Sequence, residues 1–178
     1  MKQILILLGK ARSGKDTVAD FLVKEFSFKK FVFSSVLEEE LKKKRKLITK
    51  QNMSLLGDEL RKEFGMQIIA EKLLEKVSDE QKIVFVGARS PEEIELIKQK
   101  FPEAKTFLVE ASQEKRFKRR NGLDANTLKA FFERDEIDSE KKGMKKAFGL
   151  ADYKLENNSS LSDLLNKTKA LMYNIFKD

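Results

Sequence analysis

Short apolar runs alternate with longer amphipathic stretches along this chain. Residues 3–8 form a continuous apolar run, which is typical of a central strand that is covered on both faces. Further short runs at 30–33, 83–86, 106–109 and 153–156 predict additional strands. Strands that alternate with helical stretches indicate an α/β domain with a mostly parallel sheet. We therefore predict five strands with interleaved helices.

Apolar residues at helical spacing predict helices between these strands. The stretches concerned are residues 17–26, 35–44, 54–77 with a break near Gly65, 91 onward, about 112–120, and 160 onward. Ser35 is expected to cap the second of these helices, and Ser160 begins the last. The clearest helix start is Ser-Pro-Glu-Glu at 90–93, where the serine caps, the proline occupies the first turn and Glu93 completes a capping box.

The composition narrows the chemistry that the chain can perform. The 178 residues fit one domain, predicted over residues 1–178, and the 40% hydrophobic content is enough for a single core. Cysteine and histidine are both missing, so disulfides, thiolate chemistry and imidazole bases or ligands are excluded. No apolar run approaches the roughly 18 residues of a membrane span, and we expect a cytoplasmic protein without a membrane partner. Any chemistry must use carboxylates, lysines, arginines, hydroxyls, backbone amides and bound metal ions.

The net charge of +8 favours a phosphate-containing partner, either a nucleotide or a nucleic acid. The basic residues concentrate in two blocks, 42–50 and 115–120. Each block also fits a solvated helix face, and nearby Phe117, Phe131 and Phe132 have the helical spacing of core positions. No segment matches a nucleic-acid-binding module, so we do not expect nucleic acid as a partner. An RNA-associated protein would instead show a steep salt dependence of binding.

A glycine-rich loop follows the first predicted strand directly and opens the first predicted helix. It reads Gly-Lys-Ala-Arg-Ser-Gly-Lys-Asp-Thr over residues 9–17. Glycines let the backbone curl so that successive N–H groups surround phosphate oxygens, and the following helix adds the positive end of its dipole. Lys15 is placed to bridge the β- and γ-phosphates of ATP. The residues expected to bind ATP within this loop are Gly9, Arg12, Ser13, Gly14, Lys15, Asp16 and Thr17.

The residue after the loop lysine departs from the common form of this motif. A hydroxyl normally follows the lysine and binds magnesium, but here Asp16 stands at that position and Thr17 follows it. We expect both residues to serve Mg²⁺, Thr17 through its hydroxyl and Asp16 by organising magnesium-bound water. The alternative interpretation is an ordinary strand-to-helix turn in which Ser13 caps the helix.

The Ser-Gly-Lys-Asp-Thr ending of the loop resembles a branch of the nucleoside-monophosphate kinase superfamily that includes phage-type deoxynucleotide kinases. Beyond the loop, the chain is similar to archaeal proteins related to dephospho-coenzyme A kinase and adenylate kinase. The matching stretches are residues 87–93, 116–120, 132–135, 151–153 and 157–158. The resemblance therefore covers nearly the whole chain.

This resemblance implies a three-layer P-loop NTPase fold, with a five-stranded parallel sheet flanked by helices. It also implies an acceptor-binding region between the second and third strands and an arginine-bearing helical lid over about residues 115–149. The polar, weakly helical stretch 123–149 suits such a lid. On this basis we expect a phosphotransferase that uses ATP and Mg²⁺ and moves the γ-phosphoryl group to a small phosphorylated acceptor, of the nucleoside monophosphate or dephospho-coenzyme A type.

The resemblance also assigns roles to arginines outside the loop. Arg89, at the end of the third strand, would clamp an acceptor phosphate; the alternative is that it pairs with Glu92 or Glu93 at the helix start. Arg116, Arg119 and Arg120 are lid candidates for contacting the transferred phosphoryl group. The residues expected to be catalytic are Lys15, Arg89, Arg116 and Arg120.

The resemblance suggests roles for three further residues, and alternatives remain open for two of them. Arg61 either grips the acceptor or faces solvent, and Arg134 would close over the site from the far side of the lid. Asn157 is expected to contact the edge of the adenine ring, although Asn-Asn-Ser-Ser at 157–160 also reads as an ordinary turn.

Two positions depart from the pattern that the resemblance implies. Val86 stands where an aspartate is common near the end of the third strand, and Ser34 and Ser35 stand where an acidic residue often follows the second strand. Phosphoryl transfer depends chiefly on positioning and charge neutralisation, so loss of a base need not abolish it. The departures favour an alternative, an ATP-binding regulatory or assembly factor with weak or no kinase activity, whereas the retained lid arginines argue against it.

Overall fold

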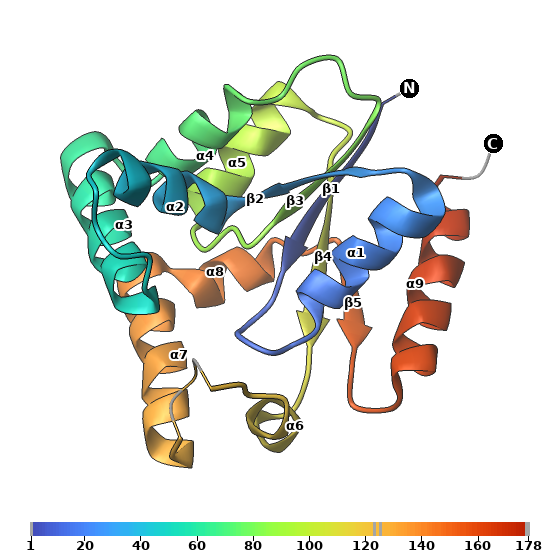
Figure 1. The fold of residues 1–178 in the computed structure, drawn as a ribbon. Helices are drawn as coiled ribbons and strands as arrows, with labels where there is room; N and C mark the ends of the chain where they lie inside the picture. Colours follow the sequence, from blue (N-terminus) through green and yellow to red (C-terminus); the bar gives the residue numbers. More distant parts are fainter. Residues whose placement is uncertain (1, 123, 125, 177–178) are drawn as a thin grey trace.

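The computed structural model describes residues 2–122, 124 and 126–176, apart from the side chains of residues 134, 135, 138, 139, 141 and 142. The chain forms a sheet whose neighbouring strands all pair in parallel, in the order β2-β3-β1-β4-β5 (Figure 1). The strands are β1 (Gln3–Leu8), β2 (Lys29–Val32), β3 (Lys82–Val86), β4 (Lys105–Glu110) and β5 (Tyr153–Glu156). The predicted five-stranded parallel sheet is confirmed.

Two helical layers cover this sheet, which confirms the three-layer architecture. One face carries α1 (Lys15–Phe26) and α9 (Leu161–Ile175). The other face carries α2 (Phe33–Lys43), α3 (Lys50–Phe64), α4 (Ile68–Leu74), α5 (Pro91–Lys100) and α8 (Met144–Gly149). Because side chains alternate along a strand, Ile6 of β1 enters the core beneath the larger layer and Leu7 enters the core beneath α1 and α9. The central strand is thus buried on both faces, as its continuous apolar run predicts.

Side-chain caps set several helix starts where the sequence predicts them. Ser90 Oγ accepts the Glu93 amide at 3.3 Å, and the Glu93 carboxylate accepts the Ser90 amide at 3.4 Å. This is the predicted capping box, with Pro91 in the first turn. Ser160 likewise accepts the amide of Asp163 at 3.1 Å and begins α9.

The expected cap at Ser35 is wrong. α2 begins two residues earlier, at Phe33, and Val32 provides no side-chain cap. Ser35 lies inside the first turn, where its hydroxyl donates to the Val32 carbonyl at 2.8 Å. The helix follows β2 without a loop because Phe33 and Val36 are both buried, and their packing outweighs the capping preference of the serine.

The long helical region after α2 is divided as the sequence indicates. α3 ends at Gly65, whose φ of 98° is unfavourable for other residues, and α4 follows it. The start of α3 lies earlier than predicted, because Thr49 caps it by accepting the Asn52 amide at 3.0 Å. Lys50 consequently becomes the first residue of a helix rather than part of a solvated basic stretch.

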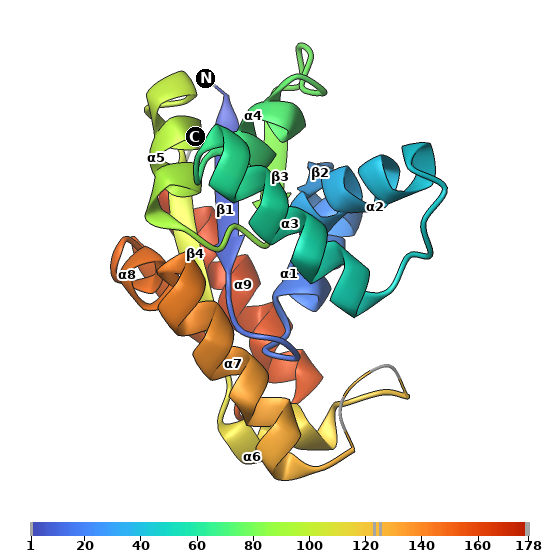
Figure 2. The same cartoon turned by 90° about the vertical axis from the view of Figure 1, so that its left-hand side faces the viewer.

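In its described residues, the expected lid region has three helices with different surroundings. α6 (Gln113–Lys118) and α7 (Leu128–Lys142) lie beyond the carboxyl edge of the sheet, while α8 packs on α5 and buries Ala147 in the core (Figures 1 and 2). Phe117 and Phe131 meet edge to face at 5.7 Å, so the aromatic residues of this region form a cluster between α6 and α7. Within the described stretches, no helix is long and apolar enough to cross a membrane.

Candidate functional site

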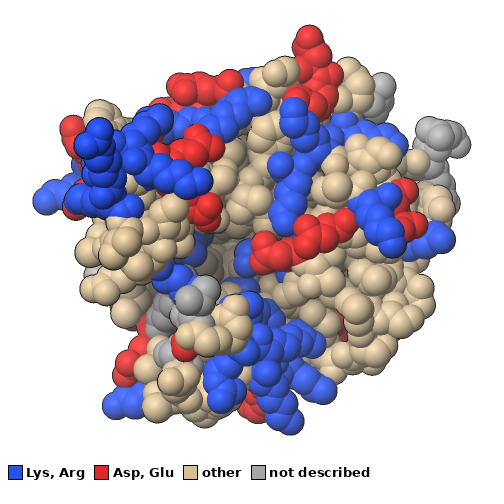
Figure 3. Space-filling view, in the orientation of Figure 1, with Lys and Arg blue, Asp and Glu red and all other residues tan. Residues whose placement is uncertain are grey.

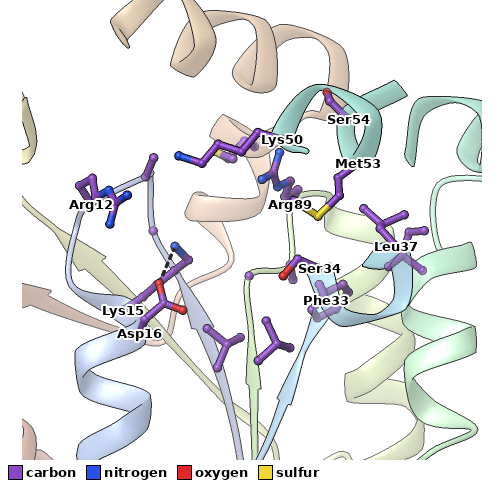
Figure 4. Close-up of a pocket in the computed structure, with 18 of the residues that line it drawn as sticks. Arg12, Lys15, Asp16, Phe33, Ser34, Leu37, Lys50, Met53, Ser54 and Arg89 are labelled. Atoms are coloured by element: carbon purple, nitrogen blue, oxygen red, sulfur yellow. Dashed lines mark hydrogen bonds and ion pairs between the residues drawn. The ribbon is translucent and has the colours of Figure 1, made fainter. Parts of the chain in front are cut away.

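A cleft of about 540 Å³ opens at the carboxyl edge of the sheet. The glycine loop and the start of α1 form one wall, and α2, α3 and the segment after β3 form the other (Figure 4). Its lining includes six Lys or Arg residues against two carboxylates, Asp16 and Asp124. Basic side chains also border the hollow on the surface seen in Figure 3. This charge balance favours an anionic ligand.

Two glycines allow the loop its shape. Gly9 and Gly14 have φ values of 152° and 104°, and a Cβ at Gly14 would lie 2.2 Å from Asn157 Nδ2. Gly14 is the N-cap of α1, so the amides at the start of this 12-residue helix face the cleft. Ser13 does not cap the helix, contrary to the alternative interpretation. It is buried, and its Oγ has no hydrogen-bond partner among the residues that the structure describes.

Gly14→Ala is expected to weaken nucleotide binding about tenfold to 100-fold, because a strained backbone costs roughly 1–3 kcal/mol here. The Gly14 substitution combines a positive φ with the close contact to Asn157. Gly149→Ala is the matched control, since a Cβ at that position meets nothing within 4 Å. Isothermal titration calorimetry measures the affinity of each variant for ATP. Equal affinities in the two variants would contradict a tightly constrained loop.

Lys15 and its neighbours occupy the first turn of α1 at the cleft. Lys15 Nζ lies 3.4 Å from Asp16 Oδ2 and points into the open space (Figure 4). Asp16 and Thr17 are exposed and line the same wall. In the described part of the chain, no three acidic residues cluster to hold a metal. One hydroxyl and one carboxylate fit Mg²⁺ nevertheless, because this ion takes most of its ligands from substrate phosphates and water.

The back of the loop is held by residues from the other half of the sheet. Asn157 Nδ2 donates to the Ser13 carbonyl at 2.8 Å, and Arg119 Nη2 donates to the Asn157 carbonyl at 2.9 Å. Arg119 Nη2 also lies 3.2 Å from Asn157 Oδ1. Asn157 is buried, and its carboxamide contacts the loop and Arg119. The expected contact of Asn157 with the adenine edge stays a prediction.

The three arginines of α6 and its end have different positions. Arg116 is 2% exposed, donates to the Ala11 carbonyl at 3.2 Å and lies 5.5 Å from the Phe132 ring centroid. Arg120 is exposed and stacks 3.9 Å from the Phe117 centroid. Only Arg119 of these three lines the cleft. This arrangement does not support a catalytic role for Arg116 or Arg120 and brings Arg119 to the site instead.

The opposite wall carries Arg89, whose side chain lies in the cleft (Figure 4). Glu93 accepts the backbone amide of Arg89 at 2.7 Å, which fixes the turn after β3. Glu93 also accepts Arg61 Nη2 at 2.7 Å, and both side chains of this pair are buried. Arg61 therefore does not face solvent; it anchors α3 to α5 while lining the cleft. The side chain of Arg134 lies outside the described residues.

The expected acidic positions are neutral in the structure as well. Val86 is buried at the end of β3 and lines the cleft floor. Ser34 also lines the cleft, whereas Ser35 donates to the backbone of β2. On α2, the Glu38 carboxylate accepts a hydrogen bond from Ser34 Oγ at 3.5 Å.

A charged cluster that sequence reasoning missed closes one side of the cleft. Asp124 accepts hydrogen bonds from Arg12, at 2.6 Å, and from Lys50. Burial by itself raises the pKa of Asp124, but the bonds from Lys50, the Asn121 amide and Arg12 outweigh it and lower the pKa to about 2. The carboxylate is thus ionised at neutral pH. Its stabilising contribution is present above about pH 4 and is lost as pH falls toward 2.

The parallel sheet, the glycine loop and the cationic cleft at its carboxyl edge define a P-loop protein with the kinase-type fold. Solved structures agree with this class, since shikimate kinase from Bacteroides thetaiotaomicron superposes with a TM-score of 0.63 at 15% identity, covering 97% of this chain and 98% of that one. Shikimate kinase from Acinetobacter baumannii, in complex with shikimate, gives 0.60 at 14% identity and covers 98% and 93%. Similarity at this identity establishes the fold.

The chain belongs to the AAA domain family, whose sequence profile matches residues 8–129, and to the UPF0200 proteins. A UPF0200 protein of Hyperthermus butylicus is 30% identical over 175 residues, covering 95% of this chain and 92% of the relative. The UPF0200/UPF0201 protein of Archaeoglobus fulgidus is 27% identical over 185 residues, covering 99% of this chain. This chain spans 57% of the length of the Archaeoglobus protein. These relatives come from archaea, as the resemblance implies.

Proposed function

We propose that this chain transfers the γ-phosphoryl group of ATP to a small phosphorylated acceptor, of the nucleoside monophosphate or dephospho-coenzyme A type. One observation carries the proposal: the glycine loop with Lys15 faces Arg89 across a single cleft. A phosphate donor on one wall and an acceptor phosphate on the other meet the main requirement of phosphoryl transfer, which is positioning with charge neutralisation.

The donor side uses the loop and the first turn of α1. Backbone amides of residues 13–16 would hold the donor phosphates, and Lys15 would neutralise charge that develops on the transferred group. Thr17 and Asp16 would hold Mg²⁺ together with those phosphates, and the ion supplies further charge neutralisation when bound. Arg119, whose Nη1 is buried without a hydrogen-bond partner in the described part of the chain, would approach the donor from the side of Asn157.

The acceptor side combines a cation with apolar surface. Arg89 presents a guanidinium that suits two phosphate oxygens at once. Phe33, Leu37 and Met53 line the adjacent wall and offer an apolar surface that suits a flat ring (Figure 4). Asp16 and Asp124 are the cleft carboxylates among the described residues, and neither lies on this wall. A phosphate oxygen is already ionised and needs no base, so this wall favours a nucleoside monophosphate over a hydroxyl acceptor.

Arg89→Lys is expected to raise the KM for the acceptor about tenfold while changing the KM for ATP little. Lysine keeps the charge but loses the two-pronged geometry of the guanidinium. Arg45→Lys is the control, because Arg45 is exposed and does not line the cleft. Initial-rate kinetics with each substrate varied in turn give the two KM values. A rise in the ATP KM alone would place Arg89 on the donor.

The proposal is tested by ADP release from Mg-ATP across a panel of acceptors: every ribo- and deoxynucleoside monophosphate, and dephospho-coenzyme A. Acceptor-dependent release that Lys15→Ala abolishes supports the kinase. ATP binding without acceptor-dependent release would support the second candidate, an ATP-binding regulatory or assembly factor. The residue at the end of β3 favours this second candidate. Val86 lines the cleft floor at the position where the resemblance implies an aspartate, so the floor has no carboxylate there.

A further inference from the structure

Asp124 lies between two cations that come from distant parts of the chain. Arg12 belongs to the glycine loop and Lys50 is the first residue of α3. Arg12 Nε and Nη2 each lie 2.6 Å from Asp124 Oδ2, and Lys50 Nζ donates to Oδ1. The Asn121 amide donates to Oδ2 at 3.0 Å. All three charged residues line the cleft, and the Asp124 side chain is only 3% exposed.

Both cations sit where local structure disfavours them. Lys50 occupies the positive end of the α3 dipole, and the first turn of α3 contains no acidic residue to offset its charge. Arg12 has a φ of 63°, in the left-handed region that residues other than glycine rarely adopt. Local preference therefore does not explain either position. The two side chains meet at Asp124. Figure 4 shows Lys50 reaching toward Arg12.

The meeting point has the chemistry of a phosphate site. A guanidinium and an ammonium converge on one carboxylate, which they bind through charge-assisted hydrogen bonds. The same donors suit the oxygens of a phosphate group, which carries more charge than a carboxylate. The site adjoins Lys15 and Arg89 in the same cleft, so a phosphate bound there would belong to a ligand already seated in the cleft.

We propose that Arg12 and Lys50 form a phosphate-binding site of the cleft, which Asp124 occupies until a phosphorylated ligand displaces it. This inference rests on the proposed function in that the ligand is a nucleotide or a phosphorylated acceptor. Lys50 is then a residue that selects phosphorylated ligands, and Asp124 lowers the affinity for any ligand that brings no phosphate to this point.

The test is a titration calorimetry comparison with inorganic pyrophosphate at constant low salt. Asp124→Asn is expected to bind pyrophosphate about tenfold more tightly than the wild type, because a charged, hydrogen-bonded competitor is removed. Asp20→Asn is the matched control: it also removes one negative charge from an ion pair, with Lys30, but lies away from the cleft. Running both variants in a Lys15→Ala background lowers the contribution of the glycine loop.

A second variant separates a ligand site from a structural ion pair. Lys50→Gln should weaken pyrophosphate binding. The double variant Asp124→Asn with Lys50→Gln should lack the tighter pyrophosphate binding expected of Asp124→Asn alone. Titrations with ATP alone and with AMP alone then assign the phosphate to the donor or to the acceptor. The inference is overturned if Asp124→Asn, folded by circular dichroism, gains no affinity for any of the three ligands, or if Lys50→Gln binds pyrophosphate as the wild type does. These readouts measure binding, so a chain that phosphorylates no acceptor can still pass or fail them.

Discussion

Lys15→Ala is expected to lower kcat/KM for the phosphoryl transfer by at least about 100-fold, the loss seen when one preorganised charge-stabilising group is removed. Lys15 Nζ projects into the cleft, 3.4 Å from Asp16 Oδ2, and its side chain is 16% exposed. The fold should be retained, because the Lys15 side chain packs in neither hydrophobic core. Steady-state rates with the best acceptor of the panel, alongside thermal unfolding, measure both effects.

Lys10→Ala provides the control for Lys15. Lys10 belongs to the same loop and carries the same charge, but it does not line the cleft. A change in rate of less than about threefold is expected, since the Lys10 side chain lies outside the cleft and does not contact the reacting groups. Comparable losses in the two variants would mean that general loop charge, rather than the position of Lys15, supports the activity.

Arg61→Met is expected to lower the free energy of unfolding by about 3–5 kcal/mol, which is roughly a 10 °C fall in Tm for a chain of this size. The Arg61–Glu93 pair joins α3 to α5 at 2.7 Å, and Glu93 is fully buried. Methionine fills much of the arginine volume but leaves the buried Glu93 carboxylate without its cationic partner. Urea and thermal unfolding give the change directly.

Lys30→Met is the matched control, because it breaks the exposed Lys30–Asp20 pair. Such a surface pair contributes about 0–1 kcal/mol, so its loss should be close to neutral. If the two methionine variants were equally stable, the Arg61–Glu93 pair would not anchor the α3–α5 contact. Activity should also fall in Arg61→Met, since Glu93 fixes the Arg89 amide.

The elements that can be predicted from this sequence are those set by local pattern. The apolar run of β1, the capping box at Ser90 and the glycine loop each depend on residues within a few positions of one another. Their physical causes, which are strand burial, amide capping and backbone curvature, act over the same short range. The order of the strands, β2-β3-β1-β4-β5, could not be predicted in this way, because strand pairing joins distant segments.

The side-chain contacts of the site that the sequence did not predict join distant parts of the chain. Asn157 binds the Ser13 carbonyl 144 positions away, and Asp124 binds Arg12 112 positions away. Nothing next to Asp124 in the sequence marks it as the partner of two cations. Lys50 is part of a basic block that reads equally well as a solvated surface, until Thr49 is seen to cap α3.

The choice among Arg116, Arg119 and Arg120 also lay beyond the sequence. These three arginines lie in the last turn of α6 and just after it, so their directions depend on where the helix ends and what it packs against. α6 ends at Lys118, which puts Arg119 at the C-cap, while Phe132 and the Ala11 carbonyl hold Arg116. Spacing alone gives no means of ranking the three.

The most direct test of the central claim is transfer of label from [γ-³²P]ATP in the presence of Mg²⁺ and each acceptor of the panel. We expect label to appear on a nucleoside monophosphate, at a rate that Lys15→Ala lowers at least about 100-fold and Lys10→Ala preserves. Label that stays on ATP with every acceptor, or that appears only as inorganic phosphate, would contradict the assignment of this cleft to phosphoryl transfer between nucleotides.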